Sequence, residues 1–306
     1  MSALQGSGTA TPVFVLGLDR SGTTWLANLL ANHPRVVAVQ AEDHFGVHES
    51  IFFSHFARAY GDLNNDQSFQ RFAADFTASD YFVLTGIEPD WFLARRPRSY
   101  SEAFRVVMDE VVARQPEPAA AWIEKSPSHT LIADRLAREF PDAKFVAIVR
   151  RPREVIASRL AVSAHPPPAY PGRIGRLLRL SRDCSLYERW LRRFCAGGDD
   201  RVLLSYGALA AHPESELARA CAVVGLEFEP EMLHLPWRRN TSFRGDETRS
   251  RGLSFPDRAV TAMALAGFGL MPSERLRARV LARQDRNEIE WPSWVWRRRD
   301  AGDTLV

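Results

Sequence analysis

The chain has 306 residues, of which 45% are hydrophobic and 25% charged, a composition that can bury the core of one α/β domain with insertions. Its 40 basic and 37 acidic residues leave a net charge of only +3, too small to indicate a nucleic-acid partner. No stretch has the apolar length of a membrane span, and Met1–Thr11 lacks the basic and apolar regions of a secretory signal. The sparse cysteines Cys184, Cys195 and Cys221 show no CxxC spacing, which favours a reducing, cytoplasmic location.

Short apolar runs alternate with helical stretches along the chain. Strands are expected at residues 12–18, 35–40, 121–124, 144–150 and 200–205. Helices are expected at 22–31, over much of 45–115, at 130–140, from Pro152 onward and at 213–224. This alternation predicts an α/β, three-layer fold with a central parallel sheet flanked by helices.

We expect residues 1–306 to form a single domain. Helical insertions are expected at about 45–118 and 163–198, and a C-terminal tail at about 236–306. After Pro236 the tail shows little periodic order until about Pro272.

Gly17–Thr24 joins the first expected strand to the first expected helix. Such a turn directs unpaired backbone N–H groups and the positive end of the helix at an anion, and Gly22 allows close approach. Three hydroxyl groups add donors: Ser21, Thr23 and Thr24. The spacing matches the glycines of the ATP-binding loop GxxxxGK[ST], but Thr23 replaces the lysine and the cation is Arg20. An anion other than ATP is therefore indicated; a tight turn without function is the alternative.

A second candidate anion site begins at Arg150, where the expected strand 144–150 ends. Ser158 follows two helical turns later, and both side chains can face a ligand beyond the carboxyl edge of the sheet. A solvated strand end is the alternative for Arg150. Two anion sites at different strand ends predict a ligand with phosphate at both ends, whereas ATP does not need the second site.

The loop Arg20–Trp25 (RSGTTW) resembles the 5′-phosphosulfate loop of sulfotransferases that use 3′-phosphoadenosine 5′-phosphosulfate (PAPS). It is similar to the arginine-bearing branch, which includes tyrosylprotein and many bacterial enzymes. Arg150–Ser158 resembles the family's 3′-phosphate motif R-[DN]-P-x-[DE]-x-x-x-S, except that Arg151 stands where Asp or Asn is usual. The resemblance covers about residues 12–245 and implies a P-loop-like fold.

The resemblance implies transfer of a sulfuryl group from PAPS to a hydroxyl or amine acceptor, which releases adenosine 3′,5′-bisphosphate without a metal. The donor-binding residues that it implies are Arg20, Ser21, Gly22, Thr23, Thr24, Trp25, Arg150, Ser158, Tyr206 and, by a weak match, Ser242. The segment 121–127 resembles the family's lysine-before-proline segment, so Lys125 and Arg20 would stabilise the bridging oxygen and the sulfate. For Lys125, a plain surface lysine is the alternative.

Glu42 is the predicted catalytic base. It lies just past the second expected strand, at the same sheet edge as Arg20. It matches the glutamate base of the tyrosylprotein-like branch if one residue is inserted. Asp43 and His44 compete for this role, and a helix-capping acid is the other interpretation of Glu42.

His44, His48 and His55 were considered as metal ligands. The first two have helical spacing, but Gly46 weakens a helix between them and no third ligand is evident, so no metal site is predicted. Rival functions are a P-loop kinase or nucleotidase that uses ATP, and a catalytically inactive relative that binds the ligand.

The acceptor is expected to be a small molecule, a glycan, a lipid-linked compound or a peptide. Basic residues recur every third position at Arg173, Arg176, Arg179 and Arg182. Near the C-terminus Trp291, Trp294 and Trp296 precede Arg297–Arg299. A solvated helix face and packing of the tryptophans on the core are the simpler interpretations; the sharper one is peripheral membrane contact or an acidic acceptor. Nothing in the sequence indicates the oligomeric state.

Overall fold

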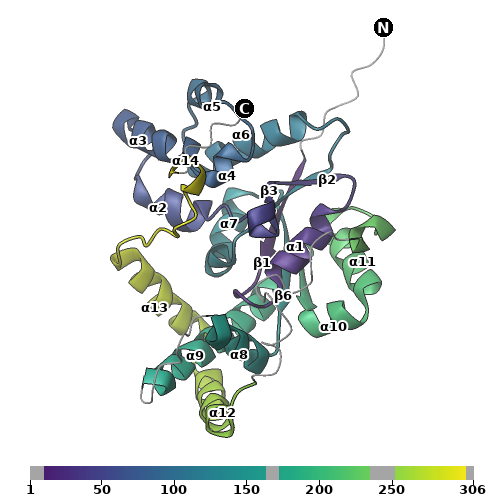
Figure 1. Cartoon of the computed structure of the whole chain (residues 1–306), viewed down its shortest axis with the longest axis vertical. Helices are drawn as coiled ribbons and strands as arrows, with labels where there is room; N and C mark the ends of the chain where they lie inside the picture. The colour runs from purple at the N-terminus through teal and green to yellow at the C-terminus, as the bar shows by residue number, and fades with distance from the viewer. Residues whose placement is uncertain (1–9, 163–171, 235–251, 301–306) are drawn as a thin grey trace.

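A computed structural model describes residues 10–162, 172–234 and 252–300 (Figure 1). Within these residues a parallel sheet has the strand order β2-β5-β1-β6-β7. The strands are β1 Thr11–Leu16, β2 Val36–Ala38, β5 Ala121–Lys125, β6 Lys144–Val149 and β7 Arg201–Ser205. In register, Val13 of β1 lies opposite Ile123 of β5 and Lys144 of β6. The expected α/β fold with a central parallel sheet is confirmed.

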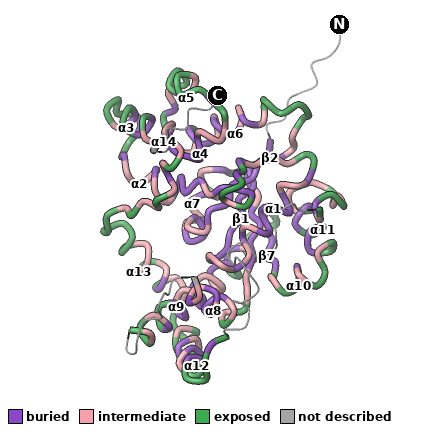
Figure 2. The backbone as a smooth tube through the Cα atoms, in the orientation of Figure 1, coloured by how far each residue is buried: buried purple, intermediate pink, exposed green. Residues whose placement is uncertain are grey.

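Most residues of the central strands β1 and β6 are apolar, because both faces of these strands are covered. Phe14 of β1 stacks on Phe145 of β6 on one face, with ring centroids 5.6 Å apart. Val13 and Val15 point to the other face, where they pack with Leu26 and its neighbours on α1 (Thr23–Ala31). The alternation of side chains therefore puts a separate hydrophobic core on each face of the sheet. Figure 2 shows β1 as a buried strand.

The first face carries the expected helical insertion. Its elements are the π-helical turn η2 Phe52–Phe56 and the helices α2 Ala57–Ala59, α3 Asp66–Thr77, α4 Asp80–Val83, α5 Pro89–Arg95 and α6 Tyr100–Ala113. Between them the phenylalanines form a continuous aromatic core; Phe52 alone contacts the rings of Phe53, Phe76 and Phe104. This core supports the sheet from behind.

The remaining helices follow the later strands. They are the 3₁₀ turn η3 Pro127–Ile132, α7 Ala133–Glu139, α8 Pro152–Val162, α9 Gly172–Cys195, α10 Tyr206–Ala211, α11 Pro213–Val224, the turn η4 Pro230–Leu233, α12 Phe255–Leu270, α13 Ser273–Arg286 and α14 Arg297–Asp300. Among the described helices, none is both long and apolar enough to cross a bilayer.

Three expected elements differ from the structure. The strand expected at 35–40 ends at Ala38, and a small antiparallel pair follows, formed by β3 Gln40–Ala41 and β4 Gly46–Val47 around the 3₁₀ turn η1 Glu42–His44. The helix expected at 130–140 begins as the turn η3. The tail before Pro272 was expected to lack order, and this was wrong because it contains the long helix α12.

Helix α12 was missed because its apolar residues do not follow the buried face. Phe255 is 85% exposed and Leu270 is 89% exposed, so no clear period marks the face that packs inward. The start of the helix does carry a signal: Ser254 and Asp257 form a reciprocal capping box.

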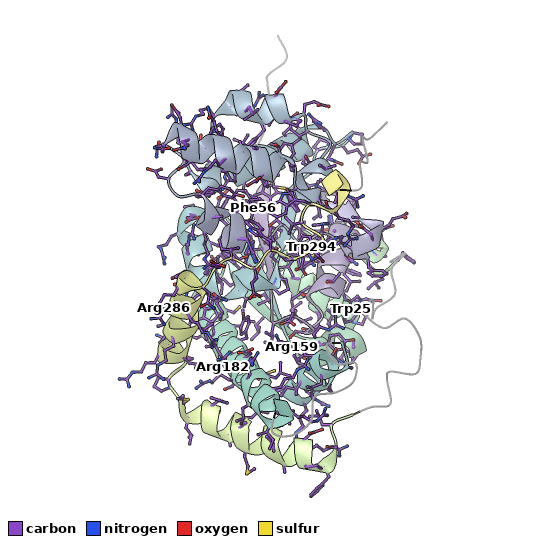
Figure 3. The ribbon with its side chains drawn as sticks, turned by 60° about the vertical axis from the view of Figure 1, so that its left-hand side comes forward. Trp25, Phe56, Arg159, Arg182, Arg286 and Trp294 are labelled. Atoms are coloured by element: carbon purple, nitrogen blue, oxygen red, sulfur yellow. The ribbon has the colours of Figure 1, made fainter. Side chains whose placement is uncertain are left out.

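The C-terminal tryptophans pack on the aromatic core, which confirms the simpler interpretation of that segment. Trp291 lies 4.9 Å from the Phe56 ring between centroids, and the indole of Trp296 donates a hydrogen bond to the Asp75 carbonyl. Phe56 is fully buried and Trp294 is half buried against the same core; Figure 3 labels both residues.

Candidate functional site

The turn between β1 and α1 is so tight that two of its positions require glycine. A Cβ on Gly17 would lie 2.6 Å from the Thr23 side chain and 2.8 Å from the Ile148 carbonyl oxygen. Gly22 has φ 98° and would place a Cβ 2.6 Å from the Tyr206 ring. Gly22 caps α1 without a side-chain hydrogen bond, so the N–H groups of the first turn can receive an anion.

A buried threonine that sequence reasoning missed holds the start of this turn. The hydroxyl of Thr130 accepts from the Gly17 N–H at 2.9 Å and donates to the Gly17 carbonyl oxygen at 3.0 Å. Thr130 lies in η3, directly after β5, and is fully buried. The lysine-bearing segment and the anion loop are therefore fixed relative to each other.

The two anion motifs meet in space. The Arg20 Nε donates to the Ser158 hydroxyl at 3.2 Å, and the Arg150 guanidinium donates to the Arg20 carbonyl oxygen at 3.4 Å. The Arg150 side chain is 21% exposed and also donates to Glu154 at 2.8 Å. The alternative of a solvated strand end is therefore wrong for Arg150.

Aromatic rings connect the same two motifs. The Arg150 guanidinium carbon lies 4.3 Å from the centroid of the Tyr206 ring. Tyr206 in turn packs edge-on against Trp25, with centroids 5.3 Å apart. Each of these residues was expected to contact one donor nucleotide.

Positive charge is concentrated in this region. Burial lowers the pKa of the Arg20 guanidinium; Asp19 opposes this shift, and Arg150 and Arg159 add to it. Burial likewise raises the pKa of Asp19, against the effects of Arg159 and Arg20. An anionic ligand would offset the repulsion among the three arginines.

A cavity of about 530 Å³ opens at the carboxyl ends of β6 and β7. Arg150, Arg151 and Tyr206 are among its lining residues. Its volume lies in the range of small-molecule and cofactor sites, about 300–1,000 Å³. Its position beyond the sheet edge is where open α/β sheets bind ligands.

Lys125 is buried, so the interpretation as a plain surface lysine is wrong. Its side chain is only 3% exposed. The Nζ donates to the Thr24 hydroxyl at 3.3 Å and to the Glu49 carboxylate at 2.9 Å. Lys125 thus reaches the anion loop from the neighbouring strand β5.

Glu49 is the acidic residue that the sequence interpretation overlooked. It follows β4, and only the β3–β4 pair brings it to Lys125. The predicted base Glu42 is an exposed residue at the start of η1, and its role stays a prediction. Its competitor Asp43 forms ion pairs with Arg297 and Arg298.

A buried hydrogen-bond network lies next to Lys125 and is centred on Glu124. The carboxylate of Glu124, the preceding residue, accepts hydrogen bonds from Ser50, Ser126 and His129 at 2.7, 2.5 and 2.9 Å. Burial alone would raise the pKa of Glu124, but His129 and the two hydroxyls hold it below its usual value. The network joins β5 to the segment that follows Glu49.

Two of the three histidines considered as ligands lie together. His44 and His48 have ring centroids 3.8 Å apart, and Asp80 completes a group of three potential metal-binding residues. His55 is elsewhere, with its Nδ1 2.9 Å from the Ser54 hydroxyl. Burial lowers the pKa of His44 and lowers that of His48 to about 3.

The remaining expectations concern the periphery. Ser242 lies outside the described residues. The arginine stripe is not free: Arg173 forms two hydrogen bonds with the buried carboxylate of Asp257 on α12, and Arg182 pairs with Asp183. The stripe therefore owes part of its pattern to internal ion pairs.

Comparison with known proteins gives the class that this fold and site define. The model of the Sulfotransferase family matches residues 12–230, and the chain belongs to this family. The match includes both anion motifs.

Two relatives illustrate the similarity. A putative protein-tyrosine sulfotransferase of Caenorhabditis briggsae is 24% identical over 229 residues, which cover 72% of this chain and 68% of the relative. The sulfotransferase domain of the Synechococcus PCC 7002 olefin synthase superposes with a TM-score of 0.50 at 17% identity, over 93% of this chain and 97% of that domain. The second likeness concerns the fold alone.

Proposed function

We propose that the chain transfers a sulfuryl group from PAPS to a hydroxyl or amine group of an acceptor and releases adenosine 3′,5′-bisphosphate. One observation carries this proposal: Arg20, Ser158 and Arg150, from motifs at the ends of two neighbouring strands, are joined by hydrogen bonds. A donor with phosphate on both the 3′ and the 5′ side can use both motifs at once.

In the proposed donor complex, the first turn of α1 and Arg20 receive the 5′-phosphosulfate. The hydroxyls of Ser21, Thr23 and Thr24 add donors there. Arg150 and Ser158 receive the 3′-phosphate, and Trp25 and Tyr206 lie against the nucleotide. Fixed charges of this kind stabilise a transition state without reorganisation, as in phosphoryl transfer.

For the chemical step we propose that Lys125 and Arg20 stabilise the charge that grows on the bridging oxygen. The base that takes the acceptor proton is Glu49 or Glu42. The contact of Glu49 with Lys125 favours Glu49, because it puts a carboxylate beside the cation expected at the sulfate. A positioned base contributes about 10²- to 10⁴-fold to the rate.

We propose only the kind of acceptor: a small molecule, a glycan, a lipid-linked compound or a peptide. The name of the C. briggsae relative makes a tyrosine-containing peptide the first acceptor to assay. The three cysteines are free, which supports a reducing cytoplasmic location.

The donor is tested by thermal unfolding with added nucleotide. We expect adenosine 3′,5′-bisphosphate to raise the melting temperature, and ATP with Mg²⁺ to have little effect, because a ligand stabilises only the state that binds it. Arg150→Met should remove most of this shift. A larger shift with Mg-ATP, together with ATP turnover, would support a kinase instead. Donor binding without turnover of any acceptor would support an inactive relative.

A further inference from the structure

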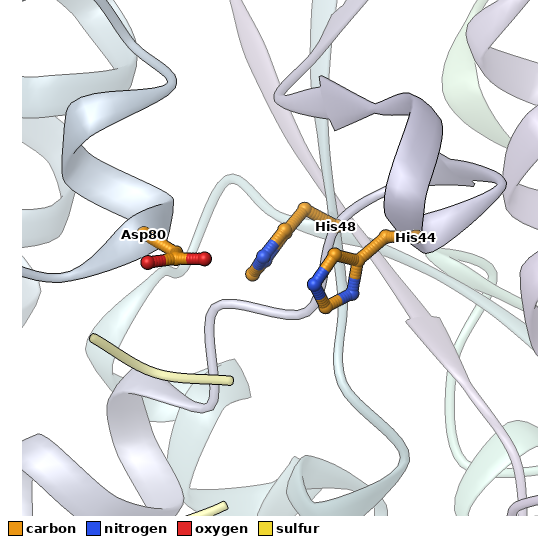
Figure 4. A group of neighbouring side chains, drawn as sticks. All are labelled: His44, His48 and Asp80. Atoms are coloured by element: carbon orange, nitrogen blue, oxygen red, sulfur yellow. The ribbon is translucent and has the colours of Figure 1, made fainter. Parts of the chain in front are cut away.

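Three potential metal-binding side chains come together from separate parts of the chain. His44 ends η1, His48 follows β4 and Asp80 begins α4. One potential ligand atom of each residue lies within 4.8 Å of the other two. Figure 4 shows the His48 ring between the Asp80 carboxylate and the His44 ring.

One polar atom of each of these side chains is buried without a hydrogen-bond partner among the described residues. His48 and Asp80 are 1% and 0% exposed. The His44 Nε2, the His48 Nε2 and the Asp80 Oδ2 have no hydrogen bond among the described residues. Such atoms are costly to bury, so three of them on side chains whose potential ligand atoms lie within 4.8 Å of one another favour a ligand that satisfies all three.

The second nitrogen of His48 fixes which lone pair is available. The His48 Nδ1 lies 2.9 Å from the Glu49 carbonyl oxygen, an acceptor, so Nδ1 carries the proton. The Nε2 is then an acceptor with a free lone pair. A ligating histidine typically donates its other N–H in this way to a backbone carbonyl.

We propose that His44, His48 and Asp80 bind one divalent transition-metal ion of the zinc type, a site separate from the sulfuryl-transfer residues. Two imidazole nitrogens and one carboxylate oxygen suit Zn²⁺, Co²⁺ or Ni²⁺, whereas Mg²⁺ and Ca²⁺ prefer oxygen ligands throughout. Ligand atoms about 2.0–2.1 Å from a tetrahedral zinc lie about 3.3 Å apart, so the ion draws the three groups together.

The charges around the group leave Asp80 able to bind a cation. The Asp80 Oδ1 accepts from the Arg298 backbone N–H at 2.8 Å. The Arg298 guanidinium is held by Asp43 at 2.9 Å, and its Nε lies 3.8 Å from the Asp80 Oδ2. Arg297 also pairs with Asp43. Arg298 therefore forms an ion pair with the Oδ2, without a hydrogen bond to it, and competes there with the ion.

The neighbouring residues cover one side of the His44, His48 and Asp80 group and leave another side open to an ion. Trp294 packs edge-on against both imidazole rings, with centroids 5.1 Å from each. His44 is only half buried, so an ion can enter from its side. The bound ion fastens the segment 44–49 to α4, and Glu49 in that segment contacts Lys125. Its role is structural support.

The test uses the full chain without an affinity tag, stripped of metal with a chelator. Co²⁺ is titrated while its absorption bands are recorded, and Zn²⁺ is measured by competition. We expect one equivalent of Co²⁺ with the bands of a tetrahedral site, and an increase in melting temperature with Zn²⁺. His48→Gln and Asp80→Asn should each weaken binding at least tenfold, whereas the matched control His55→Gln should not.

A variant that is expected to bind the metal ion more tightly is a second test, because misfolding would weaken binding and could not strengthen it. Arg298→Gln removes the competing cation and should tighten Co²⁺ binding several-fold. The proposal is overturned if the wild-type chain binds no equivalent of Co²⁺ or Zn²⁺. It is also overturned if His48→Gln and Asp80→Asn bind as tightly as the wild-type chain, or if Arg298→Gln binds less tightly.

Discussion

At the scale of single residues, the ion pair between Lys125 and Glu49 links the first turn of α1, the proposed donor site, to the segment that follows β4. Lys125 is nearly inaccessible, and its Nζ contacts both Thr24 and Glu49. In the proposed donor complex, a sulfate in the loop would attract the Lys125 ammonium and release the Glu49 carboxylate. Glu49 would then be free to take the acceptor proton.

Separate substitutions distinguish the two candidate bases. We expect Glu49→Ala to lower kcat by about 10²-fold or more with unchanged binding of adenosine 3′,5′-bisphosphate, because a base acts in the chemical step. Arg20→Ala should abolish turnover together with donor binding. If Glu49→Ala retains full turnover and Glu42→Ala loses it, the base is Glu42.

The sequence alone was enough to identify site residues that belong to a local motif at the end of a strand. Arg20–Trp25 and Arg150–Ser158 lie at strand ends, so the order of strands and helices was enough to place them at one edge. Glu49 and Thr130 could not be found in this way. Their positions depend on the β3–β4 pair and on the turn η3, which have too few residues to show a period.

At the scale of elements, the π-helical turn η2 links the segment that contains Glu49 to the aromatic core. Its residue His55 packs near Trp291, with centroids 5.7 Å apart. Burial lowers the pKa of His55 to about 4, and the nearby His129 adds to the shift. The neutral form of the His55 imidazole is therefore favoured in the folded chain.

This shift predicts how stability depends on pH. Between its folded pKa of about 4 and its unfolded pKa of about 6.5, His55 binds a proton in the unfolded chain but not in the folded one. Stability should therefore fall as the pH is lowered from about 6.5 toward 4. His55→Gln should make this fall shallower in urea unfolding measured across that range. Equal slopes for the variant and the wild type would contradict the prediction.

The sequence predicted the strands of the sheet better than the later helices. A strand buried on both faces is a short apolar run with clear ends, as in Lys144–Val149. The buried residues of α12 are Asp257, Thr261 and Ala264, two of which are polar. Its pattern therefore differs from that of a typical helix, whose buried face is apolar. Only its capping box marks where it begins.

At the scale of the whole molecule, α12 is fixed to α9 at both ends. Arg173 bonds Asp257 near the start of α12, and Arg189 donates to the carbonyls of Gly269 and Met271 at its end. The outer side of α12 exposes large apolar side chains: Phe255, Met263 and Leu270. The exposed apolar side of α12 now supports the proposed membrane contact. Arg173 does not, because it pairs with Asp257.

Liposome cosedimentation tests the membrane proposal. We expect the wild-type chain to sediment with vesicles that contain anionic lipid, because exposed apolar side chains can enter the interface. The double substitution Met263→Glu and Leu270→Glu should abolish sedimentation, whereas Glu231→Gln, on the exposed turn η4, should not. A wild-type chain that stays in the supernatant would end the idea.

The position of β1 also affects how the protein is made. Among the described strands of the sheet, the middle one, β1, leaves the ribosome first, and its partners β5 and β6 begin only at Ala121 and Lys144. At about 5–20 residues per second, the nascent chain waits on the order of ten seconds for these partners. During that time both backbone edges of β1 lack their partner strands and its apolar faces are uncovered, so efficient synthesis should depend on chaperones that cover it.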